Sequence, residues 1–209
     1  MTQMQALGHP RNGWLALAAV LTCSSPSLAI AKACPAKGDA KQALAKNLNV
    51  YKNRIAAPTA QQIDASVTLA ALLAPGLDLN RWDRRRAAIV EGVIVKVKTA
   101  GVESANCHAK DAAHRDTHIE IALSRSAPSR EHVIVEITPR WRTKMRALDW
   151  SPARLRKLMV PGKTLRVTGW LFDDLEHVNA AENTHPAGVH NWRATVWEIH
   201  PVTGFSVLP

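Results

Sequence analysis

Several short segments between residues 87 and 201 alternate apolar and polar side chains, and this period of two constrains the fold most. Strands are expected over Ala87–Lys98, Thr117–Leu123, Glu131–Thr138 and the two ends of Gly162–Pro201, with a short edge strand over Thr203–Leu208. Ser151 and Pro152 are typical of a helix start, so a helix is expected over Ala153–Met159. The predicted order is therefore three strands, one helix and two strands.

This order resembles the OB-fold, a mainly β architecture with a five-stranded barrel and a helix between strands three and four. The segments VEGVIVKV and GKTLRVTGW carry the resemblance, which covers about Arg86 to Pro201. The final segment WEIHPVT resembles one found in uncharacterised exported bacterial proteins, which implies no activity. A small β-sandwich is the competing architecture, but it leaves the helix at Ala153–Met159 without an obvious role.

Residues 1–33 are interpreted as a signal peptide. Arg11 precedes the apolar run Trp14–Leu21, and small residues follow as far as Ala33, which is the usual order for a secretory signal. The apolar run is shorter than the roughly 20 residues that a membrane span needs. The mature chain is therefore expected to be exported, either periplasmic or secreted, with no transmembrane segment after cleavage.

The mature chain is expected to have two parts. Residues 34–80 form a helical N-terminal segment, with helices over Asp39–Asn49 and Ala60–Ala74, and residues 81–209 form the barrel domain. Thr59 is the expected N-cap of the second helix.

Cleavage near residue 33 leaves two cysteines, Cys34 and Cys107. In an oxidising compartment two such thiols favour a disulfide, which here ties the N-terminus to the domain. The alternative is that Cys107, next to His108, binds a metal or reacts as a thiol.

The chain carries 27 Lys and Arg against 17 Asp and Glu, a net charge of +10, and a basic surface attracts polyanions. Several arginines stand beside tryptophans, which suits phosphate contacts and base stacking with single-stranded nucleic acid. The predicted ligand-binding residues are Arg81, Trp82, Arg140, Trp141, Arg142, Trp192 and Arg193. Alternatively, the tryptophans fill the ends of a small barrel and arginine stems cover them.

Two polar loops, Thr99–Asp116 and Asp173–Asn191, concentrate histidines and acids, the side chains that bind Zn²⁺ and related ions. In an OB-fold the loops after strands one and four frame the same face. Any site is therefore expected where Asn106–His118 faces Asp173–His190. The predicted metal ligands are His108, His118, His177, His185 and His190.

The candidate catalytic residues are His118, Glu136 and His177. His118 and Glu120 on the second strand, and Glu136 on the third, point away from the apolar set and are expected on the outer face. An acid beside His118 can orient it as a general base. The favoured interpretation, however, is an exposed cross-strand pair with a structural role.

The leading functional interpretation is an exported, non-catalytic OB-fold module that binds a polyanionic or extended ligand such as single-stranded nucleic acid. One alternative is a hydrolase, specifically a phosphodiesterase, that depends on a divalent metal such as Zn²⁺ and has a His/acid site at the barrel rim. Another is a periplasmic scaffold whose N-terminal helices dock a partner protein.

Overall fold

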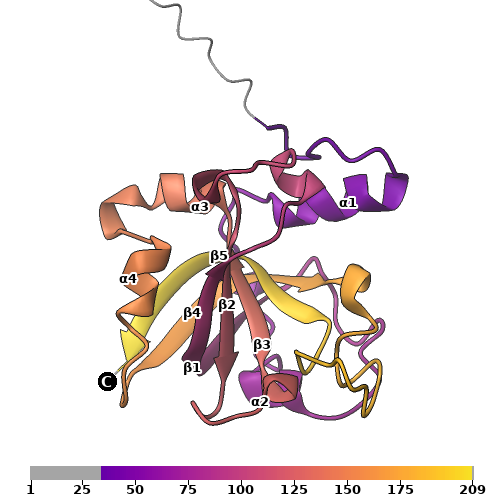
Figure 1. Cartoon of the computed structure of the whole chain (residues 1–209), viewed down its shortest axis with the longest axis vertical. Coiled ribbons are helices and arrows are strands. Elements are labelled where there is room, and N and C mark those ends of the chain that lie inside the picture. Colours follow the sequence, from indigo (N-terminus) through magenta and orange to yellow (C-terminus); the bar gives the residue numbers. More distant parts are fainter. Residues whose placement is uncertain (1–33, 209) are drawn as a thin grey trace, which may run out of the picture. The chain divides into compact units, whose positions relative to one another are not determined.

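The computed structural model describes residues 34–208, and its five strands form a closed barrel (Figure 1). The strands are β1 (Ala87–Thr99), β2 (Thr117–Ala122), β3 (Val133–Ile137), β4 (Thr164–Asp173) and β5 (Trp197–Leu208). Their order around the barrel is β1-β2-β3-β5-β4, with β4 pairing back onto β1. Only the β3–β5 pair is parallel. This is the expected OB-fold-like barrel. The predicted signal peptide lies outside the described residues.

Two short helices connect β3 to β4. The expected helix is α4 (Pro152–Arg156), and the Ser151 hydroxyl accepts a hydrogen bond from the backbone N–H of Arg154, as an N-cap should. A second helix, α3 (Pro139–Lys144), lies between the predicted strand and the predicted helix, where the sequence predicts no element. Thr138 caps α3 through a bond from the backbone N–H of Trp141.

The N-terminal segment is less helical than expected. Helix α1 covers Ala43–Lys52, but the single helix predicted over Ala60–Ala74 is wrong. A 3₁₀ turn at Ala60–Gln62 and the short helix α2 (Leu69–Leu73) replace it. The carboxylate of Asp64 accepts bonds from the backbone N–H and hydroxyl of Ser66, a local turn that competes with helix formation.

Strand β5 begins later and ends later than predicted. Residues 192–196, expected to be its first part, form no strand, whereas Thr203–Leu208 continues β5 instead of forming a separate edge strand. The long strand pairs with β3 through its first residues and with β4 along most of its length. Because it bonds to both neighbours, β5 closes the barrel.

Apolar side chains fill the barrel interior. The fully buried side chains include Ile119, Ile121, Val133, Val135, Val167, Leu171 and Ile199. Gly92 lets α2 approach β1, since a Cβ at that position would lie 2.7 Å from Leu69 Cδ2. The core therefore includes the N-terminal segment as well as the strands.

The outer face of β2 and β3 is buried, contrary to expectation. His118, Glu120 and Glu136 point away from the apolar core, yet each is no more than 6% exposed. Helix α1 contacts β5 from this side, and Trp192, in the connection between β4 and β5, packs against His118. His118 and Glu136 do pair across the two strands, as expected, but the pair is buried and the expected exposure is wrong.

The predicted disulfide between Cys34 and Cys107 is confirmed. It joins the first described residue to the loop between β1 and β2. Among residues 34–208 no helix is both long and apolar enough to cross a membrane.

Replacing both cysteines by alanine is expected to lower the free energy of unfolding by roughly 2–4 kcal/mol. The reason is that the bond closes a loop between residues 73 apart, which restricts the unfolded chain. Urea unfolding of the double variant and of the oxidised wild type measures the difference. An equal stability of the two proteins would contradict this account.

Candidate functional site

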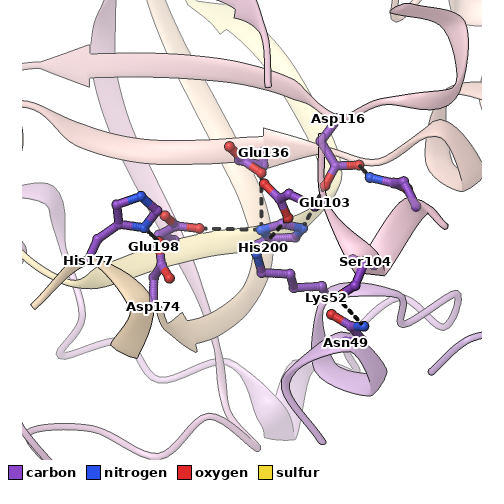
Figure 2. Close-up of polar contacts among 12 residues, drawn as sticks. Asn49, Lys52, Glu103, Ser104, Asp116, Glu136, Asp174, His177, Glu198 and His200 are labelled. Atoms are coloured by element: carbon purple, nitrogen blue, oxygen red, sulfur yellow. Dashed lines mark hydrogen bonds and ion pairs between the residues drawn. The ribbon is translucent and has the colours of Figure 1, made fainter. Parts of the chain in front are cut away.

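A cavity of about 290 Å³ opens beside the covered face of β2 and β3. Its walls come from α1, strands β1, β2, β3 and β5, the loop after β1, and the connection between β4 and β5. Figure 2 shows several of the lining side chains. The lining residues with charged, imidazole or indole side chains are Lys52, Lys98, Glu103, His118, Glu136, Asp174, Glu176, His177, Trp192 and Glu198. All three candidate catalytic residues, His118, Glu136 and His177, lie in this wall.

The strand register pairs His118 with Glu136. The two residues are direct partners across β2 and β3, and His118 Nδ1 lies 2.8 Å from Glu136 Oε1. His118 Nε2 is buried without a hydrogen bond, since Glu120 Oε1 at 3.5 Å is too far for a well-formed one. Burial lowers the pKa of His118, but the carboxylates of Glu120 and Glu136 outweigh it and raise the pKa above its ordinary value.

A second imidazole is fixed by a carboxylate in the connection after β4. His177 Nδ1 lies 2.5 Å from Asp174 Oδ2, and the two residues belong to one 3₁₀ turn, Leu175–His177 with Asp174 as its N-cap. The bond to Asp174 raises the pKa of His177, and burial opposes it only in part. The side chain of His177 is 46% exposed, whereas that of Asp174 is buried. His177 is therefore both oriented and open to solvent.

Trp192 brings these two histidines to one place. Its ring centroid lies 5.8 Å from that of His118 and 5.4 Å from that of His177. Lys98 Nζ lies 5.4 Å from the same centroid, a cation–π distance. His118, from the predicted stretch Asn106–His118, and His177, from the predicted stretch Asp173–His190, thus lie around this indole.

A buried arginine holds the connection against β5. Arg193 is fully buried; its Nη1 donates to Asp174 Oδ2 at 3.0 Å and its Nη2 to Glu198 Oε1 at 2.7 Å. Its Nε donates to the backbone carbonyl of Thr195. The same carboxylate oxygen of Asp174 thus bonds both Arg193 and His177, so Arg193 fixes the position of the Asp174–His177 pair.

Lys52 supplies a second buried cation. Its Nζ lies 2.8 Å from Glu103 Oε2, and its side chain is 7% exposed. Burial alone lowers the pKa of Lys52, but the surrounding carboxylates, Glu103 first, raise it above its ordinary value. The ammonium group therefore stays charged inside the acid-rich wall (Figure 2).

Behind the cavity, His200 is enclosed by three carboxylates. Its Nε2 lies 3.3 Å from Asp116 Oδ2, and its Nδ1 lies 3.3 Å from both Glu136 Oε2 and Glu198 Oε2 (Figure 2). Burial lowers the pKa of His200, but the nearby carboxylates of Asp116, Glu198 and Glu136 raise it to about 10. One ligand atom each from Asp116, Glu136 and His200 lies within 4.8 Å of the others.

The other predicted metal ligands lie elsewhere. His108 pairs with Asp39 near the disulfide, and neither His185 nor His190 lines the cavity. Of the five predicted ligands, only His118 and His177 come together.

Most of the predicted anion-binding side chains are engaged inside the protein. Arg142 donates to the hydroxyl of Thr117 and to the backbone carbonyls of Ala113, Arg115 and Ile137. Arg140 donates to Asn53 Oδ1 and to the carbonyl of Cys34. Arg81 pairs with Asp78, and Trp82 packs on Trp197. Trp141 is buried. Of this set, Trp192 alone lines the cavity.

Sequence reasoning missed Lys52, included Glu103 and Asp116 only as acids of the first polar loop, and found no partners for Glu198 and His200. The alternation in WEIHP does place Glu198 and His200 on one side of β5. Nothing local indicates that Lys52, on a helix far away in sequence, faces the same side chains.

Comparison with protein families, with characterised proteins and with solved structures finds no match to this chain.

Replacing Arg193 by leucine is expected to lower the free energy of unfolding by roughly 3–5 kcal/mol, because it leaves Asp174 and Glu198 buried without their cation. The matched control is Arg166→Leu, which removes a half-exposed pair with Glu91. That change is expected to cost at most about 1 kcal/mol. Urea unfolding measures both, and equal effects would contradict a buried role for Arg193.

Proposed function

We propose that the protein is a hydrolase of phosphodiesters or similar phosphate esters, with its reaction centre in the cavity beside Trp192. The observation that carries the proposal is the pair of imidazoles, His118 and His177, each bonded through Nδ1 to a carboxylate and each lining the same cavity. A carboxylate at Nδ1 fixes the ring and its tautomer, which leaves Nε2 for a substrate or a water.

His177 is assigned the role of general base. Asp174 holds its Nδ1, and its partial exposure lets Nε2 take a proton from an attacking water. His118 is assigned a supporting role in the cavity wall, because its Nδ1 bonds Glu136 while its Nε2 is buried. Solvent reaches the His177 side chain, which is 46% exposed.

The lining favours water as the nucleophile. No serine, threonine or cysteine side chain lies among the residues that line this cavity in the described part of the chain. The cavity lining therefore offers no hydroxyl or thiol nucleophile for a covalent intermediate. Direct attack by an activated water needs only the general base. The expected reaction class is hydrolysis in one step.

The substrate is assigned from the cations at the cavity. Lys98, with a side chain 44% exposed, lies over Trp192, and Lys52 lies deeper in the wall. The ammonium group of Lys98 can hold the negative charge of a phosphate ester, whereas that of Lys52 is already paired with Glu103. The partly exposed indole offers an apolar surface for the leaving group.

The non-catalytic module for single-stranded nucleic acid stays a prediction from the sequence. Its salt-dependent anion binding needs free guanidinium groups, and those of Arg140, Arg142 and Arg193 already donate to internal acceptors. The paired histidines therefore give the hydrolase proposal more support than these arginines give to nucleic-acid binding. The scaffold interpretation is less supported, because α1 packs on the barrel and contributes Lys52 to the cavity.

Export forms part of the proposal. The disulfide at Cys34 supports it, because such bonds persist in oxidising compartments. In that case the substrate is met outside the cytoplasm.

The variant His177→Ala is expected to lower kcat/KM for bis(p-nitrophenyl) phosphate at least about 100-fold, the usual contribution of a general base. His185→Ala is the matched control, since that histidine lies in the same connection but not at the cavity. The control should keep wild-type activity. If wild type shows no hydrolysis of phosphate esters, or if both variants lose activity equally, the proposal fails.

The pH dependence of kcat/KM tests the assignment of His177. A general base works in its neutral form, so the rate should rise with pH through the pKa of His177, which Asp174 holds above about 6.5. The variant Asp174→Asn removes the main cause of that shift, so the rising limb should move to lower pH. The melting temperature of the variant is measured alongside. A limb that keeps its position would remove His177 as the base.

A further inference from the structure

Three buried side chains next to the cavity share one pattern. In each, one polar atom makes a hydrogen bond to a neighbouring side chain and the other makes none. Asp116 accepts a bond from Asn106 Nδ2 through Oδ1, at 3.1 Å, while its Oδ2 makes no hydrogen bond. The ring of His200 bonds Glu198 through Nδ1, while its Nε2 makes none.

Glu136 completes the pattern. Its Oε1 accepts from His118, and its Oε2 has only a 3.3 Å contact with His200 Nδ1. Asp116 is 1% exposed, His200 is fully buried and Glu136 is 5% exposed. Buried polar atoms without partners are rare in folded proteins and call for a ligand or a functional explanation.

We infer that Asp116 Oδ2, Glu136 Oε2 and His200 Nε2 bind a divalent transition-metal ion of the Zn²⁺ or Mn²⁺ kind. Two carboxylates and one imidazole form a ligand set that such ions accept, and catalytic sites commonly use three protein ligands. The arrangement around them matches the usual outer shell, in which a carboxylate holds the second nitrogen of a metal-binding histidine. Here Glu198 has that role.

The geometry is close to what an ion needs. One ligand atom from each of the three residues lies within 4.8 Å of the others, and Asp116 Oδ2 and His200 Nε2 are 3.3 Å apart. Glu136 Oε2 lies 3.3 Å from His200 Nδ1, so the Glu136 carboxyl group must turn toward Nε2 to bring all three atoms about 2.1 Å from one ion. Asn106, His118 and Glu198 hold the three ligands in place.

The local charge also favours a cation. Five carboxylates, Asp116, Glu136, Glu198, Asp174 and Glu103, surround this region. Three permanent cations, Lys52, Arg193 and Arg142, lie near them. A divalent ion reduces this excess of negative charge, and buried charges are stable only when they are paired. The competing arrangement is a doubly protonated His200 that bridges the carboxylates with no metal.

Glu136 connects this site to the cavity. It is a ligand in the proposed metal site and also lines the cavity beside His118 and His177. An ion held there can accept a water or a phosphate oxygen from the cavity as a further ligand. The proposed metal site does not depend on the proposed hydrolysis, because ion binding is measured without substrate.

The test is a direct measurement on the purified full chain. After treatment with a chelator, the protein is titrated with Zn²⁺ and with Mn²⁺ by calorimetry, and its metal content is counted by mass spectrometry. Wild type should bind one ion per chain with at least one of the two metals. Asp116→Asn and His200→Gln should lose that ion. Glu198→Gln, which removes the support of His200, should bind it roughly 10–100-fold more weakly.

The control is His185→Ala, which should bind the ion like wild type, because His185 lies in a loop outside the site. Circular dichroism confirms that each variant is folded; if His200→Gln is not, Asp116→Asn and Glu198→Gln decide. Wild type that binds neither ion overturns the inference in favour of the protonated His200. Full binding by a folded Asp116→Asn overturns it too. A bound ion without hydrolysis supports the metal site and refutes the proposed function alone.

Discussion

The buried ion pairs of Arg193 hold together the region that contains the cavity and its histidines. Its guanidinium group joins Asp174, in the connection after β4, to Glu198 at the start of β5. Asp174 in turn orients His177, and Glu198 in turn bonds His200. Without this cation, both carboxylates lose a buried guanidinium partner and the connection loses its side-chain link to Glu198 on β5. The position of His177 therefore follows from a salt bridge, and only indirectly from the strands.

A second buried cation that pairs with a carboxylate explains why α1 belongs to the functional region. Lys52 reaches from α1 into the acid-rich wall and pairs with Glu103. The disulfide and the side chain of Asn53, which donates to the carbonyl of Ala105, tie the loop carrying Glu103 to the N-terminal segment. Residues 34–80, expected from the sequence to be a separate segment, thus help to cover the polar face of the barrel. Because that face is covered, its polar side chains are buried, whereas on an open barrel face they would be solvated.

The sequence predicted the barrel well because strand periodicity is a local property. Alternation identified β1 to β4, and it placed His118 opposite the apolar set on β2. Alternation tells which side of a sheet a residue faces but not whether that side is covered, so His118 and Glu136 were expected to be exposed. Coverage depends on α1 and on Trp192, whose contacts span long sequence separations. The error over Ala60–Ala74 has a different cause, the turn at Asp64 that outweighs helix propensity.

The central claim is that the buried polar groups behind Trp192 form a site for a ligand and are not only a charge network that stabilises the barrel. Anomalous X-ray diffraction from crystals grown with Mn²⁺ tests this most directly, because it locates the ion without reference to any reaction. The account predicts one strong peak between Asp116 Oδ2 and His200 Nε2, within about 2.3 Å of both atoms. Crystals that show no peak there, or show one only at the exposed loop histidines His185 and His190, would contradict it.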